Sequence, residues 1–249
     1  MEYKIAIETG NTGLWYGRII DFPGTHARAR SLPNLLKELE EEAYYHNTWL
    51  RRHGETQIDL DDLHIKIVER INDVNMLGES GGEVALFEFD LESVNDDYLK
   101  KCIKYMEYNR EDLLILLIGV NKETLNFIPP GKKRNIVQIL GHICNVEEWY
   151  ISRLGLDAEE FYKENLGVTE EEADNLPIHE RMKIVRNAVN NTLFEIIPKR
   201  EGVFTRQEYC LFPDEKWSAR KVLRRFLEHE REHIYNIRWY LRHEIRRFP

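Results

Sequence analysis

The 249-residue sequence has few cysteines and prolines and no long apolar run. Its three cysteines, Cys102, Cys144 and Cys210, lie far apart and form no CxxC motif, which argues against a disulfide scaffold and suits a reducing compartment. The longest apolar stretch, LLILLIGV at 113–120, falls well short of the roughly 18 residues that cross a bilayer. The N-terminal MEYKIAIETG lacks the basic and apolar segments of a secretory signal peptide. We therefore expect a cytoplasmic protein without a membrane partner.

Negative charge is concentrated at the start of the chain. Residues 1–95 hold 18 acidic and 9 basic side chains, a difference equal to the whole net charge of -9. This excess repels phosphate backbones, so we expect no nucleic-acid binding there and a basic protein as the better-suited partner. With 42% hydrophobic residues and only 8 prolines, the composition is that of a folded globular protein and excludes extended disorder.

The first 92 residues predict a small α+β domain. Alternating or clustered apolar residues indicate strands at 3–7, 14–20, 64–68 and 84–89, with the turn GNTG between the first two. Ser31 is suited to cap a helix that has Pro33 in its first turn and ends at Gly54. Strands on both sides of one helix are typical of an α+β unit.

From residue 93 to 249 the pattern predicts helices, and their lengths indicate a four-helix bundle. The expected helices cover about 95–119, 134–154, 177–197 and 219–246. Residues 169–172, TEEE, form a capping box in the long connection between the second and third helices, and Ser218 is suited to cap the fourth. The chain is thus expected to comprise two domains, 1–92 and 93–249.

The fourth predicted helix carries two histidines four residues apart, His229 and His233, at the edge of its apolar face. At about 100° per residue the two imidazoles lie one turn apart and are able to converge on one point. The arginines and glutamates Arg224, Glu228, Arg231, Glu232, Arg238 and Arg242 occupy the opposite side. Glu230 falls within the apolar face, where a carboxylate is costly unless a cation or a proton meets it.

A third histidine, His142, borders the apolar face of the second predicted helix. Together with His229 and His233 it would form a three-histidine metal site with an open fourth position, as in catalytic rather than structural centres. Neutral imidazoles suit zinc, nickel or iron. The alternative is that each histidine is an ordinary partly buried residue bonded to a carbonyl, because an HxxxH pair alone is a weak motif.

Two segments of this region resemble the DinB-like (DinB/YfiT) family of four-helix bundles. They are NIVQILGHICNVEEWYISRLG, which contains His142, and KWSARKVLRRFLEHEREHIYNI, in which a Trp-Ser helix start precedes HxxxH. The resemblance covers about residues 93–249. It implies that His142, His229 and His233 are the metal ligands. It also implies reactions such as transfer of a low-molecular-weight thiol, in which the metal holds the thiol as thiolate.

The residue between the two histidines of HxxxH has two alternative roles. Glu230 either orients a ligand or acts as an acid/base catalyst, or it is a structural carboxylate paired with a nearby arginine. The sequence leaves both open.

The N-terminal region resembles the HicB-like antitoxin fold. The resemblance lies in YKIAIETG followed by LWYGRIIDFPGTHARARS and a helix, with the family's Pro-Gly turn at Pro23 and Gly24. Antitoxins of this type neutralise a basic RNase partner. The family's DNA-binding C-terminus is here replaced by the helical region, so a dimerisation or substrate-gating role fits equally.

These observations predict a divalent-metal-dependent enzyme acting on a small molecule, by thiol transfer or hydrolysis. A low-molecular-weight thiol is a candidate cofactor, and a homodimer is the expected assembly. The alternative is a non-catalytic interaction protein whose acidic HicB-like domain binds a protein partner and whose bundle dimerises.

Overall fold

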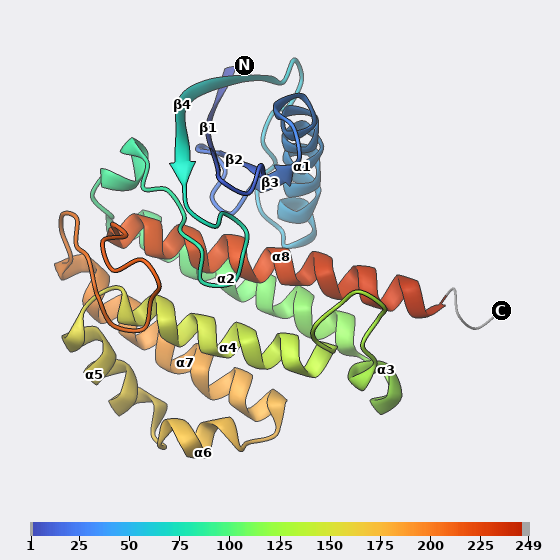
Figure 1. Cartoon of the computed structure of the whole chain (residues 1–249), viewed down its shortest axis with the longest axis vertical. Coiled ribbons are helices and arrows are strands. Elements are labelled where there is room, and N and C mark those ends of the chain that lie inside the picture. Colours follow the sequence, from blue (N-terminus) through green and yellow to red (C-terminus); the bar gives the residue numbers. More distant parts are fainter. Residues whose placement is uncertain (1, 246–249) are drawn as a thin grey trace. The chain divides into compact units, whose positions relative to one another are not determined.

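The computed structural model describes residues 2–245, and the chain divides into two compact units (Figure 1). The first unit combines the chain up to Ser93 with Gly202–Arg224, and the second combines Val94–Glu201 with the chain from Arg225 onward. The last long helix, α8 (Ala219–Ile245), therefore contributes its first turns to one unit and its remainder to the other.

The first unit is built on a four-stranded sheet, as an α+β unit requires. The strands are β1 (Glu2–Gly10), β2 (Trp15–Ile19), β3 (His26–Ala29) and β4 (His64–Val74), in the order β3-β2-β1-β4. β2 runs antiparallel to both β1 and β3, and β4 runs parallel to β1. The strands predicted around residues 3–7, 14–20 and 64–68 are confirmed, whereas β3 was not predicted.

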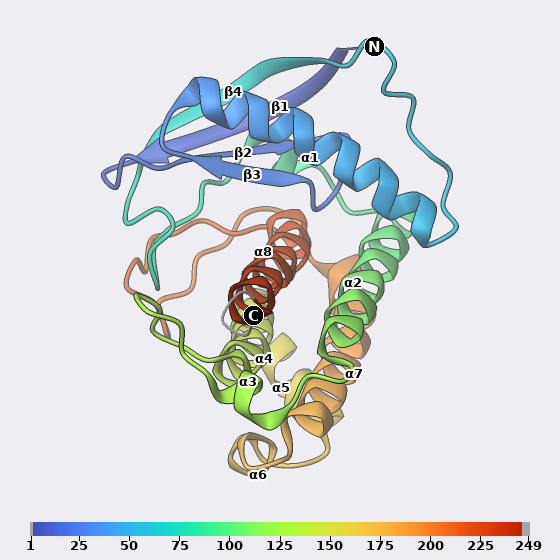
Figure 2. The same cartoon turned by 90° about the vertical axis from the view of Figure 1, so that its right-hand side faces the viewer.

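Helix α1 (Leu32–Arg52) covers one face of this sheet (Figure 2). Tyr3, Ile5 and Ile7 alternate along β1 and pack in one buried cluster with Leu35 and Leu39 of the helix. Gly17 of β2 permits this approach, because a Cβ there would lie 2.7 Å from a methyl carbon of Leu39. The predicted cap is confirmed, since the Ser31 side chain accepts a hydrogen bond from the backbone N–H of Asn34.

The strand predicted at 84–89 is wrong. Side chains, instead of a neighbouring strand, bond the backbone of this segment, which ends in the short 3-10 helix η1 (Glu88–Leu91). The N–H of Ala85 donates to Glu8 at 2.7 Å, its carbonyl accepts from Arg224 at 2.9 Å, and the N–H of Val84 donates to Glu215 at 3.1 Å. Apolar clustering indicated burial correctly, because Phe87 is buried, but a buried segment need not be a strand.

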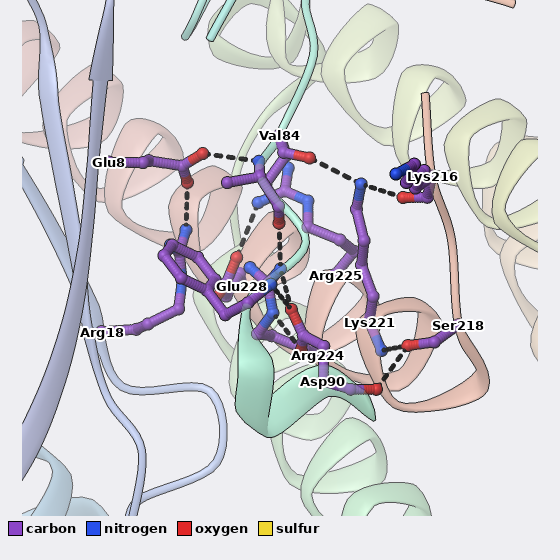
Figure 3. A network of polar contacts seen from close by, with 12 residues as sticks. Glu8, Arg18, Val84, Asp90, Lys216, Ser218, Lys221, Arg224, Arg225 and Glu228 are labelled. Atoms are coloured by element: carbon purple, nitrogen blue, oxygen red, sulfur yellow. Dashed lines mark hydrogen bonds and ion pairs between the residues drawn. The ribbon is translucent and has the colours of Figure 1, made fainter. Parts of the chain in front are cut away.

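The first turns of α8 are fixed by the same polar network (Figure 3). The predicted cap Ser218 accepts from the N–H of Lys221 at 3.1 Å and donates to the carbonyl of Asp90 at 2.6 Å. The Arg224 guanidinium donates to both oxygens of the Asp90 carboxylate, at 3.0 and 2.8 Å. The buried side chains of Asp90 and Arg224 therefore have polar partners, as their burial demands.

Arg224, Glu228 and Arg231, which the sequence places on the side of α8 opposite its apolar face, are all buried. Arg224 pairs with Asp90, and Glu228 accepts from Arg225 at 2.7 Å. Hydrophobic periodicity places the apolar stripe of a helix correctly, but it does not detect a polar face that is buried with its partners.

Helices dominate the second unit, as predicted. The long ones are α2 (Asp96–Leu117), α4 (Ile136–Ser152), α7 (Ile178–Ile196) and the remainder of α8; the short ones are α3 (Lys122–Asn126), α5 (Leu156–Leu166), α6 (Glu170–Asp174) and the 3-10 turn η2 (Ile197–Lys199). The TEEE capping box is confirmed, since Thr169 and Glu172 bond reciprocally at the start of α6. Within residues 2–245, no helix has both the length and the hydropathy that crossing a bilayer requires.

Replacing Asp90 by alanine should destabilise the chain by about 3–5 kcal/mol, because the buried guanidinium of Arg224 would lose its carboxylate partner. Chemical denaturation of the full chain measures this change. The matched control is Lys37→Ala, which removes an exposed pair with Glu41 and should change the free energy of unfolding by no more than about 0.5 kcal/mol. Equal effects of the two substitutions would contradict the structural role of Asp90.

Lys221 should make the free energy of unfolding depend on pH in the alkaline range. Burial lowers the pKa of this fully enclosed ammonium to about 8, although the Glu215 carboxylate opposes the change. Between that value and the ordinary pKa of about 10.4, the unfolded chain binds the proton that the folded chain has released, so stability contributed at this position rises with pH. The free energy of unfolding of the wild type, minus that of Lys221→Met, should therefore increase by up to about 3 kcal/mol between pH 8 and 10.5. A pH-independent difference between the two proteins would contradict the lowered pKa.

Candidate metal centre

The three predicted ligands converge in the second unit. His142 lies in the second turn of α4, and His229 and His233 lie one turn apart on α8. The Nε2 atom of His229 lies 3.3 Å from that of His142 and 3.1 Å from that of His233. One ring nitrogen from each histidine falls within 4.8 Å of the other two, so the three imidazoles form one cluster.

These separations match the requirements of a metal centre. A zinc–imidazole bond of about 2.0–2.1 Å at a tetrahedral angle puts two ligand nitrogens about 3.3 Å apart. The two Nε2 separations of 3.3 and 3.1 Å are close to this value. The donor set of three histidines also suits nickel and iron. The residues present therefore fit a divalent ion with an open coordination position.

The electrostatic surroundings keep two of these imidazoles neutral. Burial, with the charge of Arg134 adding to it, lowers the pKa of His142 to about 4. Burial also lowers the pKa of His229 well below its ordinary value, and the neighbouring His233 and His142 add to this effect. Since a metal ion binds the neutral imidazole, neither ring has to lose a proton first at neutral pH.

An aromatic side chain packs against one histidine of the cluster. The buried ring of Tyr150 meets His229 edge to face at a centroid distance of 6.0 Å and Phe226 at 5.2 Å. Further along α8, the hydroxyl of Tyr240 donates to the carbonyl of Arg134 at 2.8 Å and ties this helix to the segment before α4. The two helices that carry the ligands are thus joined on both sides of the cluster.

Glu230, the predicted catalytic residue, has its carboxylate elsewhere. Its Oε1 accepts from Arg110 at 2.6 Å and its Oε2 from Arg186 at 2.8 Å, and the side chain is 2% exposed. Burial alone would raise the pKa of Glu230, but the two guanidinium groups hold it below its ordinary value. The contacts are those of the paired-carboxylate alternative, and a catalytic role for Glu230 stays a prediction.

The partners of Glu230 were not predicted from the sequence. Arg110 of α2, Glu147 of α4 and Arg186 of α7 are all buried, and Glu147 accepts hydrogen bonds from both arginines. Each of them interrupts an apolar stripe at helical spacing, for example Arg110 four residues after Met106 and Arg186 four after Met182. A charged residue at an inward position of each long helix is the pattern that would have identified this set.

The cysteines lie outside the cluster of ligands. Cys102 and Cys144 are buried, as expected of small apolar residues. Burial raises the pKa of the Cys144 thiol to about 12, so that it keeps its proton at neutral pH and is a poor nucleophile.

The fold and the site together define a helical protein with three converging histidines. The DinB superfamily model matches residues 105–237, which is just over half of the chain and includes all three histidines. The protein belongs to the DinB superfamily. No curated protein and no solved structure gives a significant match to the chain.

His142 should titrate far below an ordinary histidine in the metal-free protein. Its imidazole should remain neutral until the pH falls to about 4, because protonation would put a charge into a partly buried site beside Arg134. Side-chain nitrogen NMR across pH 3–8 measures this, with the His142 resonances assigned from their loss in His142→Gln. A midpoint near the ordinary value of about 6.5 would show that the site is solvated and open.

Proposed function

We propose that the second unit is a four-helix bundle of α2, α4, α7 and α8 that binds one divalent metal ion through His142, His229 and His233. The observation that carries this proposal is the approach of the three Nε2 atoms, at separations that suit one ion, in a chain of the DinB superfamily. The chain is then a metal-dependent enzyme acting on a small molecule, with zinc, nickel or iron as the candidate ion.

The reaction that suits such a site is thiol transfer or hydrolysis. A bound ion with an open position supplies a Lewis acid and lowers the pKa of a water molecule or a low-molecular-weight thiol there. The residues of the chain hold the ligand set: burial keeps His142 and His229 neutral, and Tyr150 packs against the ring of His229. The thiol proton would leave to solvent or to a base. Glu230 is the residue that the sequence predicts for the role of base.

A second candidate function concerns the first unit. We propose a HicB-like fold for residues 1–92, which the order of three strands, a helix and a fourth strand supports. The charge of residues 1–95, 18 acidic against 9 basic side chains, favours a basic protein partner over nucleic acid. In this alternative the protein is a non-catalytic interaction module, and the helical unit serves to form a homodimer.

Elemental analysis tests the metal proposal directly. Protein purified without a polyhistidine tag or chelator should contain about one zinc, nickel or iron per chain. His229→Ala should lose it, because it removes the histidine whose Nε2 lies beside both of the others.

The matched control is His179→Ala, which removes an exposed histidine of α7 and should leave the metal content unchanged. Wild-type protein that binds no ion, even after zinc, nickel and iron are added, would contradict the metal proposal and favour the interaction module.

A further inference from the structure

Four buried charged side chains, one from each long helix of the second unit, meet in a closed set. Arg110 of α2, Glu147 of α4, Arg186 of α7 and Glu230 of α8 form this set, which we call the charge ring. Each arginine contacts both glutamates: Arg110 lies 2.7 Å from Glu147 and 2.6 Å from Glu230, and Arg186 lies 2.8 Å from Glu230 and also bonds Glu147. The charges therefore alternate and sum to zero.

The ring fixes its helices more firmly than the ion pairs alone would. Arg110 also donates to the carbonyl of Met182 on α7, and Arg186 donates to the carbonyl of Met106 on α2, each at 2.8 Å. The two arginines thus cross between α2 and α7 in opposite directions. All four side chains are no more than 7% exposed, so a helix that rotated out of place would leave a buried charge without its partner.

The ring shares two helices with the histidines. Glu230 is the residue after His229, and Glu147 lies five residues beyond His142. A rotation of about 10° about a helix axis moves an atom about 6 Å from that axis by about 1 Å. A metal site tolerates errors of only about 0.2 Å in its metal–ligand distances. A modest rotation of α4 or α8 would therefore spoil the convergence of the imidazoles.

We infer that the charge ring positions the metal site: Arg110, Glu147, Arg186 and Glu230 are positioning residues that set the rotation of α4 and α8 and so hold His142, His229 and His233 together. This inference rests on the proposed metal function. In this role Glu230 affects the site without contacting substrate or ion. Arg110 and Arg186 do the same from α2 and α7, the two long helices that carry none of the three histidines.

Cobalt(II) binding to the full chain tests the inference, because its visible spectrum reports the ligand geometry. Glu147→Gln keeps the shape of the side chain but leaves the ring with one excess positive charge, which by itself repels a cation. The double variant Glu147→Gln, Arg186→Gln restores a neutral ring that keeps the Arg110–Glu230 ion pair alone, and so separates charge from position. Both variants should bind cobalt about tenfold more weakly or worse, with an altered spectrum.

The matched control is Glu8→Gln, which removes a buried carboxylate from its 2.6 Å ion pair with Arg18 in the first unit. It should bind cobalt as the wild type does. If the glutamine variants do not fold, an apolar ring of similar volume (Arg110→Met, Glu147→Met, Arg186→Met and Glu230→Leu) avoids unpaired buried charge, and it should fold but bind cobalt weakly.

The outcomes separate the two proposals. Wild-type affinity and spectrum in folded ring variants would overturn this inference alone. Recovery of wild-type affinity in the neutral double variant would assign the effect to net charge, and would overturn it too. A wild-type chain that binds no cobalt would overturn the metal proposal and, with it, the positioning role.

Discussion

Ionic side chains in the interior of this protein have to be paired, and that requirement constrains how the helices that carry them pack. In the second unit Arg110, Glu147, Arg186 and Glu230 satisfy it as a neutral alternating set, one residue from each long helix. Apolar packing alone tolerates small rotations of a helix, because one hydrophobic contact replaces another. Paired charges do not, since a displaced guanidinium loses a partner that nothing else in the interior replaces.

The same constraint acts along α8, which belongs partly to each unit. Lys221 is paired with Glu215, and Arg224 is paired with Asp90, in the first unit. Six residues after Arg224, in the second unit, Glu230 joins the ring beside the candidate metal ligands. A single helix therefore carries the polar anchor of the N-terminal fold and two of the three histidines.

The sequence was sufficient to predict the long helices and the clustering of the three histidines, and insufficient to predict the polar interior. Regular apolar spacing and side-chain caps located α2, α4, α7 and α8, and HxxxH with a facing histidine located the cluster. The segment 84–89 was misread because burial without a neighbouring strand looks the same in the sequence as a buried strand. The ring was missed because its members are residue types that usually lie at the surface, and the interruption of the apolar stripe in each long helix does not show which charges pair.

The most direct test of the central claim is X-ray absorption at the zinc edge of protein loaded with one equivalent of zinc. A three-histidine site should give three imidazole nitrogens at about 2.0–2.1 Å from the zinc and one further light atom at the open position. In His142→Gln, the outer-shell scattering should decrease from that of three imidazole rings to that of two. A first shell of oxygen atoms without imidazole scattering would mean that zinc binds elsewhere on the chain. That result would contradict the assignment of His142, His229 and His233 as the metal site.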